Sequence, residues 1–321
     1  MQKNFLWGSS ISGGQCEGGY DSRGETVVDL IPAGKDTRFQ YLDNPGIYMT
    51  RPAGFYPSQK GVEFYEHYKD DIALYAKMGL KALRFSILWS RIFQDDSLTP
   101  QEEGLQFYDR VIDELIKHHI EPIITTIHFD MPVWVVEKYN GFYNKKVVEL
   151  YEHYVKTIVN RYHDRVKYWI SFCEINVMNH ALYMVAGTIV QKGQNRDEIL
   201  HQCAYHQLLA NAILVKVCHE MDDLLKVGCE VAGSPCYPLT SSPQDYQLMM
   251  EADRSNYRYT DVMVKGHFPY YFLKELQQYH VEMLAEDIDI IQKNTLDFIA
   301  VSYYKTGVAS SEGITTNPQL E

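Results

Sequence analysis

The sequence predicts an α/β fold, a (β/α)8 TIM barrel of which about six of the eight strand–helix units are present. Short apolar runs rich in β-branched and aromatic residues alternate along the chain with longer segments of helical periodicity. The runs are continuous rather than alternating, which is typical of buried parallel strands. No glycine-rich dinucleotide fingerprint follows the first run, so the barrel is favoured over a doubly wound sheet.

The apolar runs are the predicted strands, and each is expected to lie inside a sheet covered by helices. In chain order the runs are residues 4–12, 82–89, 122–128, 168–174, 226–232 and 296–303. Two other segments, residues 24–57 and 307–321, show loop composition and little periodicity. We predict long loops there without a helix or strand, the first on the face where such barrels bind their ligands.

Three helices between these strands are predicted from apolar residues that recur on one face. The first covers residues 58–78, the second begins at the capping box Thr99-Pro100-Gln101-Glu102, and the third begins near Asn144. Their inward-facing residues, in chain order, are Val62, Tyr65, Tyr68 and Ile72, then Leu105, Tyr108, Ile112 and Leu115, then Val148, Tyr151, Val155 and Ile158.

Composition and charge limit the function classes. The chain has 321 residues, 45% of them hydrophobic, and a formal net charge of −12. Its lysines and arginines are scattered, which argues against nucleic acid or an anionic membrane as a partner and favours a small molecule. No repeat, low-complexity tract or Pro/Ser-rich linker marks a boundary, so residues 1–321 are expected to form a single domain.

Location and metal binding are also limited by the sequence. No stretch approaches the roughly 20 apolar residues of a membrane span, and no signal-peptide pattern follows Met1, so we expect a cytoplasmic protein. The six cysteines contain no Cys-x-x-Cys pair and are expected to be free thiols. No histidine pair has a carboxylate or thiol at a metal-binding spacing, so neither a metal nor a cofactor is expected.

Polar side chains lie within or just after the predicted strands, where barrel enzymes place functional groups. In strand order they are Gln15 and Glu17, Arg84 and Trp89, His128 and Asp130, Glu174 and Asn176, and Tyr303 and Tyr304. Burying arginine, glutamate and histidine together costs on the order of several kcal/mol unless they pair, and a functional site is the usual reason for it. We therefore expect a ligand site at this end of the barrel.

Glu174 is the leading candidate for acid–base chemistry. It stands where the apolar residues 169–173 end, and desolvation at such a place favours the protonated carboxyl that a general acid needs. The alternative is a structural ion pair between Glu174 and Arg84 across the barrel mouth. The corresponding alternative for His128 is a hydrogen-bonded core histidine. Cys173 is expected to be an inert buried thiol rather than a nucleophile, because no basic residue is near it in sequence.

Five short motifs occur in order and span nearly the whole chain. They are Phe5-Leu6-Trp7-Gly8 with Ser12-Gly13-Gly14-Gln15-Cys16-Glu17-Gly18, then Arg84-Phe85-Ser86-Ile87-Leu88-Trp89-Ser90-Arg91, then His128-Phe129-Asp130-Met131-Pro132, then Phe172-Cys173-Glu174-Ile175-Asn176, and last Asp297-Phe298-Ile299 leading to Ser302-Tyr303-Tyr304. Each is weak alone, but the ordered set is specific. With these motifs the chain resembles glycoside hydrolase family 1 and, within it, the 6-phospho-β-glucosidase branch.

The resemblance implies a (β/α)8 barrel that hydrolyses β-glycosidic bonds with retention, using two carboxylates about 5 Å apart. Glu174 then matches the acid/base, and Gln15 and His128 match residues that hydrogen-bond the sugar. Arg84 and Tyr304 match residues that keep the nucleophile ionised. Cys173 stands where the family usually has an asparagine that contacts the sugar 2-hydroxyl, so its presence is expected to weaken or alter activity.

The resemblance also bears on the second carboxylate. The nucleophilic glutamate of this family lies on the seventh strand, whereas this chain ends in the loop after the sixth. We therefore expect the nucleophile to be missing, either because the sequence is incomplete, because the gene is shortened, or because the chain is one part of a split enzyme. The partners compatible with this expectation are a complementing C-terminal segment and a second copy of the chain.

The substrate prediction is a phosphorylated β-glycoside. Ile175 follows Glu174 at the place where simple glucosidases usually have proline, and this favours hydrolysis of 6-phospho-β-glucosides. The first alternative is a plain β-glucosidase or β-galactosidase. The second is a non-catalytic sugar-binding remnant of such an enzyme, which Cys173 and the missing nucleophile favour.

Overall fold

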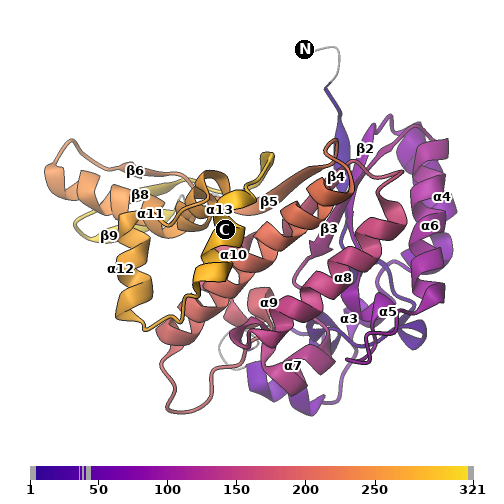
Figure 1. Cartoon of the computed structure of the whole chain (residues 1–321), viewed down its shortest axis with the longest axis horizontal. Coiled ribbons are helices and arrows are strands. Elements are labelled where there is room, and N and C mark those ends of the chain that lie inside the picture. Colours follow the sequence, from indigo (N-terminus) through magenta and orange to yellow (C-terminus); the bar gives the residue numbers. More distant parts are fainter. Residues whose placement is uncertain (1–4, 36, 38–39, 41–44, 317–321) are drawn as a thin grey trace.

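A curled parallel sheet forms the centre of the molecule in the computed structural model, which describes residues 5–35, 37, 40 and 45–316 (Figure 1). Its strand order is β1-β2-β3-β4-β5-β7, so the sheet is an open half-barrel. The strands are β1 Gly8–Ser10, β2 Ala82–Ser86, β3 Glu121–Ile127, β4 Tyr168–Phe172, β5 Lys226–Gly233 and β7 Phe298–Tyr303. All six predicted strands are thus confirmed, most with tighter bounds.

The register of the sheet brings the carboxyl ends of its strands to one rim. Ser10 of β1 lies beside Arg84 of β2, and Ile127 of β3 lies beside Phe172 of β4. On the other side, Gly233 of β5 lies beside Tyr303 of β7. Residues that directly follow these strands therefore gather at the same end of the half-barrel.

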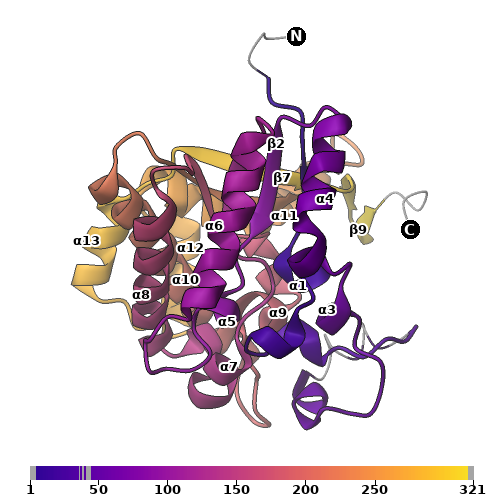
Figure 2. The ribbon, with the colours of Figure 1, turned by 90° about the vertical axis from the view of Figure 1, so that its right-hand side faces the viewer.

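Long helices cover the outer face of the sheet (Figure 1). They are α4 Phe64–Lys77, α6 Glu102–Lys117, α8 Lys146–Tyr162 and α10 Arg196–Met221. Figure 2 shows the same layer after a quarter turn, with α6, α8 and α10 running along the strands. The predicted inner faces of α6 and α8 are confirmed, because Leu105, Tyr108, Ile112, Leu115, Val148, Tyr151, Val155 and Ile158 are all buried.

The remaining elements are the long helix α11 and a set of shorter helices and strands. Before β5 they are α1 Gly13–Cys16, η1 Tyr20–Ser22, η2 Val27–Leu30, η3 Pro45–Thr50, α3 Pro57–Lys60, α5 Trp89–Ile92, α7 Val133–Tyr139, η4 Gly141–Tyr143, η5 Ile175–Asn179 and α9 Leu182–Ala186. After β5 they are β6 Cys236–Pro238, α11 Pro243–Lys265, α12 Tyr270–Gln278, α13 Ala285–Lys293, β8 Gly307–Ser310 and β9 Gly313–Thr316.

The first two predicted helices differ from those observed. The helix predicted over residues 58–78 is two helices, α3 and α4, separated at Gly61, whose φ is +58°. Val62 therefore lies outside the helical face and is 64% exposed rather than inward. Helix α6 begins at Glu102, not at the predicted capping box, because the Gln101 N–H donates to the Ile92 carbonyl and Gln101 itself has extended backbone.

The loop predictions are partly wrong. In residues 307–316, β8 and β9 form an antiparallel hairpin, and β8 also pairs with β6. The hairpin forms because Gly313, at φ +119°, permits a tight turn. Residues 317–321 lie outside the described residues. Residues 24–57 contain the 3-10 helices η2 and η3 and are otherwise mostly irregular, and residues 36, 38–39 and 41–44 of this segment lie outside the described residues.

The two end strands also depart from the prediction that every strand is covered. In the described part of the chain, β1 and β7 each pair on one side only within the main sheet. Along β7 the outward side chains of Ile299, Val301 and Tyr303 are 42%, 60% and 64% exposed. The four middle strands are mostly buried, as predicted.

One hydrophobic cluster runs between the sheet and its helices. All six cysteines are free thiols, as predicted from their spacing. Among the described residues, no helix is both long and apolar enough to cross a membrane. The same residues contain no group of three or more His, Cys, Asp or Glu side chains arranged to hold a metal ion.

Candidate active site

A cavity of about 600 Å³ opens at the carboxyl ends of the strands. All six residues predicted to form the site line it: Gln15, Arg84, His128, Cys173, Glu174 and Tyr304. They come from α1, from β2, and from the segments after β3, β4 and β7. The parallel register explains this convergence, since it brings these strand ends to one rim. The roles of the six residues stay predictions.

Glu174 is held at the cavity by both its backbone and a hydrogen bond. It follows β4 directly, is 7% exposed, and has a φ of +47°, an unfavourable conformation for a residue with a side chain. The Tyr304 hydroxyl donates to its Oε1 over 2.5 Å. Burial and this contact raise the pKa of Tyr304 to about 12, so the phenol stays a donor at neutral pH.

The alternative of a Glu174–Arg84 ion pair is wrong, because Arg84 pairs with another carboxylate. That partner is Glu230 of β5, which accepts a close contact from Arg84 Nη1. Ser302 donates to the other carboxylate oxygen of Glu230 over 2.5 Å. Burial alone would raise the pKa of Glu230, but the charge of Arg84 and the Ser302 hydrogen bond outweigh it and hold the pKa below its usual range.

Glu230 was missed by sequence reasoning. It lies inside a predicted strand, residues 226–232, whereas the candidate site residues were sought mainly at the ends of the strands. The available signal was a charged residue in the middle of a buried run, the same signal that singled out Arg84 in β2.

Cys173 and His128 contact each other on the cavity wall, with 3.3 Å between Sγ and Nε2. Burial and, to a smaller extent, the nearby Arg84 charge lower the pKa of His128 to about 4, although the Glu230 charge opposes both. Burial and the Glu230 charge raise the pKa of the Cys173 thiol well above its usual range. At neutral pH the pair is therefore an uncharged imidazole and an uncharged thiol, which agrees with the prediction of an inert thiol despite the basic partner.

Asp130 positions His128 from outside the cavity lining. It is 1% exposed and accepts the backbone N–H of His128 over 2.9 Å and the Ser86 hydroxyl over 3.3 Å. Burial, with the charge of Glu17 adding to it, raises the pKa of Asp130 to about 7. Gln15 lies across the cavity on α1, exposed, and its Oε1 accepts the Ser12 hydroxyl over 3.0 Å.

Other polar residues at the predicted strand ends have structural contacts and do not line the cavity. Glu17 is buried against Arg91 and Tyr108 at 2.9 and 2.5 Å. The Asn176 side chain bonds the backbone of β5 at Ala232, at 2.9 and 2.8 Å. The Tyr303 side chain is 64% exposed.

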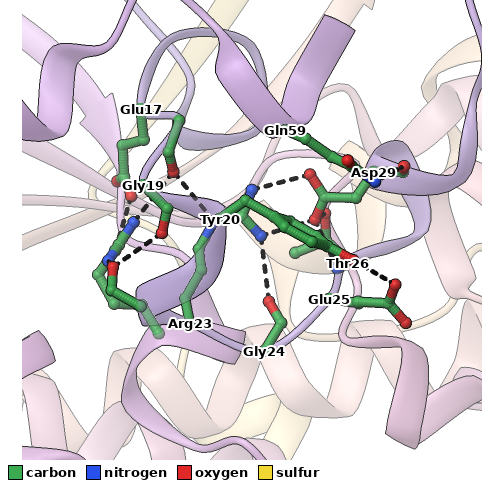
Figure 3. Close-up of polar contacts among 12 residues, drawn as sticks. Glu17, Gly19, Tyr20, Arg23, Gly24, Glu25, Thr26, Asp29 and Gln59 are labelled. Atoms are coloured by element: carbon green, nitrogen blue, oxygen red, sulfur yellow. Dashed lines mark hydrogen bonds and ion pairs between the residues drawn. The ribbon is translucent and has the colours of Figure 1, made fainter. Parts of the chain in front are cut away.

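A buried ion pair between Arg23 and Asp29 (Figure 3) holds together the loop that follows α1. Arg23 donates two hydrogen bonds to Asp29, at 2.6 and 2.8 Å, and both side chains are fully buried. Asp29 also accepts the backbone N–H and hydroxyl of Thr26, at 2.8 and 2.7 Å. The neighbouring residues Val28 and Ile31 line the cavity, so this anchor fixes part of its wall.

The fold and the site together define a β/α-barrel protein whose described cavity lining holds one carboxyl group, one ion-paired arginine and several uncharged hydrogen-bonding groups. The chain belongs to the family described as Glycosyl hydrolase family 1, whose model matches residues 1–319. This agrees with the resemblance carried by the five motifs.

Two curated relatives illustrate the family relationship. The chain is 39% identical to 6-phospho-beta-glucosidase AscB of Escherichia coli (strain K12), over 97% of this chain and 66% of that protein. It is 40% identical to aryl-phospho-beta-D-glucosidase BglH of Bacillus subtilis (strain 168), over 97% of this chain and 65% of that protein. The chain thus spans about two thirds of the length of these relatives.

Solved structures agree with the barrel fold. A family 1 β-glucosidase from Thermotoga maritima superimposes with a TM-score of 0.80 at 25% identity, covering 99% of this chain and 69% of that one. The AHE enzyme from Alicyclobacillus herbarius gives a TM-score of 0.79 at 25% identity, covering 99% of this chain and 70% of that one. The predicted fold class is therefore confirmed.

Proposed function

We propose that the chain carries the acid/base half of a retaining β-glycosidase that acts on 6-phospho-β-glucosides. Glu174 protonates the oxygen of the leaving group and then activates water for the second step. The observation that carries the proposal is Glu174 itself, a 7% exposed carboxyl at the cavity, held by the Tyr304 hydroxyl.

The surrounding residues suit an uncharged sugar ring. Gln15, His128 and Cys173 offer hydrogen-bonding groups without net charge at neutral pH, which fits sugar hydroxyls better than an anion. Arg84 is the one lysine or arginine in the described lining, and Glu230 compensates it. The phosphate preference is therefore supported by the names of the relatives and by Ile175 after Glu174, rather than by a free cation in the described cavity.

The proposal includes a complementing C-terminal segment that supplies the nucleophile. Glu174 is the one carboxylate in the described lining, whereas retention requires two. Arg84 and Tyr304 are proposed to support that nucleophile when it is present. A second copy of the chain is the other candidate partner. We also propose that the described chain is a single domain, which the one hydrophobic cluster supports, and that it is cytoplasmic, which six free thiols support.

The experiment measures nitrophenol release from aryl β-glucoside 6-phosphate and from the unphosphorylated glucoside. The chain is assayed alone and with the C-terminal third of a family relative. Turnover of the phosphorylated substrate that is lost in Glu174→Gln supports the proposal. Faster turnover of the plain glucoside would instead indicate a plain β-glucosidase or β-galactosidase.

A sugar-binding remnant is the second candidate function, because Cys173 occupies a place next to the proposed acid/base where the family resemblance implies asparagine. It predicts glycoside binding without turnover in every combination of segments. Restoring the asparagine in Cys173→Asn separates the two candidates: the catalytic proposal expects faster turnover, whereas the binding proposal expects changed affinity alone.

A further inference from the structure

Glu230 is a buried charged residue that the proposed mechanism does not use. It lies in the middle of β5 and is 4% exposed. Its ion-pair partner, Arg84, is on β2, and two strands, β3 and β4, separate β2 from β5 in the sheet. In a flat sheet these strands would lie about 14 Å apart. The contact therefore spans the concave interior of the half-barrel.

Three strands meet at this carboxylate. Arg84 comes from β2, Glu230 from β5, and Ser302 from β7, which donates to Glu230 over 2.5 Å. Arg84 and Ser302 line the cavity, whereas Glu230 lies behind them. Removing one member of such a buried pair leaves an uncompensated charge, which is costly, so Glu230 constrains where the Arg84 guanidinium can lie.

The Glu230 carboxylate also interacts electrostatically with Cys173 and His128. The titratable groups around the thiol are Arg84 from β2, His128 after β3, Glu174 after β4, Glu230 from β5 and Tyr304 after β7. Among them, Glu230 is the largest charge effect acting against thiolate formation, and Arg84 acts in the opposite direction. A cysteine beside a histidine and an arginine with no such anion is the usual setting of a reactive thiolate.

We propose that Glu230 is a positioning residue of the candidate active site, whose carboxylate holds Arg84 and Ser302 at the cavity wall and disfavours the thiolate form of Cys173. Cys173 then presents a neutral thiol to a sugar instead of a nucleophilic thiolate. This inference rests on the proposed function only for what the cavity binds.

The test measures the alkylation rate of Cys173 by iodoacetamide across pH 7–9.5 in the full 321-residue chain, resolved by peptide mass spectrometry. In Glu230→Gln we expect roughly a three- to tenfold faster reaction at Cys173, because the thiolate fraction changes about tenfold per unit of pKa. Glu230→Asp keeps the charge and should stay near the wild-type rate. Cys16, half-buried on α1, is the internal reference.

Asp287→Asn is the matched control, because Asp287 is also a buried carboxylate paired with a cation, Lys145, but lies on α13 outside the sheet. It should leave the Cys173 rate unchanged. An unchanged rate in Glu230→Gln, or an equal rise in Asp287→Asn, would overturn the proposal. Since alkylation needs no hydrolysis, failure here is distinguishable from failure of the catalytic proposal.

If Glu230→Gln does not fold, a double-mutant cycle measured by thermal unfolding tests the proposal instead. Arg84→Met, Glu230→Met and the double variant are compared by their melting temperatures. The proposal expects the double variant to unfold no lower than either single variant, because it removes both charges together. Destabilisation that adds across the two sites would show that the residues are not coupled and would overturn it.

Discussion

The described cavity lining holds one carboxyl group, that of Glu174, and further groups that are uncharged or ion-paired. Glu174 is bonded by an uncharged phenol, and Arg84 is neutralised by Glu230. Cys173 and His128 both stay uncharged because they are buried, since burial raises the pKa of the thiol and lowers the pKa of the imidazole. Under the proposed function, Glu174 is the group that carries the acid–base chemistry in this cavity.

His128 provides a direct check on this electrostatic picture. Histidines in an unfolded chain take up a proton near pH 6.5, whereas the pKa of His128 is lowered to about 4. The unfolded state thus binds more protons between these values, and this residue destabilises the fold as pH falls from about 6.5 toward 4 and has no such effect above. We expect its ring NMR signals, assigned with His128→Gln, to stay unchanged from pH 8 to 5. A midpoint near 6.5 would contradict the burial argument.

Residue identities at strand ends were predictable, but their partners were not. Six parallel strands place Glu174, His128 and Tyr304 at one rim whatever the curvature of the sheet. Which carboxylate meets Arg84 depends on that curvature, because Glu230 reaches it across the interior. Local sequence carries no information on this contact, since residues 84 and 230 are far apart in the chain.

At the scale of single elements, helix α6 shows that a helix need not start where a capping-box sequence predicts it. The residues at 99–102 have the form of a capping box, but the backbone bond from Gln101 to Ile92 starts the helix two residues later than that box implies. Gln101 is the N-cap and makes no side-chain capping bond. The helical face itself was predicted correctly, because it depends on periodicity rather than on the terminus.

The vacant cap predicts a stabilising substitution. Gln101→Asp should raise the free energy of unfolding by about 0.5–1 kcal/mol, because aspartate accepts from the free N–H groups of the first turn. Thr99→Ala, which alters the residue that the capping box would have used, should change it by less than about 0.5 kcal/mol. Urea denaturation of both variants checks this, and a larger loss from Thr99→Ala would restore the capping box.

Between α3 and α4, Gly61 is predicted not to tolerate replacement by a residue with a side chain. An alanine Cβ at Gly61 would lie 2.7 Å from the Cys16 carbonyl oxygen, at a φ of +58°. Gly79, at φ +86°, would meet nothing within 4 Å. Gly79→Ala should therefore cost about 1 kcal/mol from backbone strain alone, and Gly61→Ala should cost about 1–3 kcal/mol more from overlap. Equal losses in urea denaturation would mean that the close approach at Gly61 is relieved by movement.

At the scale of the whole molecule, the half-barrel has a covered centre and open sides. Helices α4, α6, α8 and α10 cover the middle of the sheet, whereas β1 and β7 each pair on one side in the described part of the chain (Figure 1). Open strand edges with exposed apolar side chains are templates for pairing with another chain. The same surfaces are where a complementing segment or a second copy would bind under the proposed function.

These edges predict self-association of the chain alone. Val301 is 60% exposed on β7, so Val301→Lys should shift the protein toward monomer in sedimentation velocity at micromolar concentration, because a lysine on an edge strand opposes pairing. Leu224→Lys is the control, since Leu224 is 67% exposed but lies in the loop between α10 and β5 rather than on an edge strand. We expect wild type and Leu224→Lys to show the same concentration-dependent association. If both lysine variants dissociate equally, general surface charge rather than the β7 edge controls assembly, and the complementing segment would have to bind elsewhere.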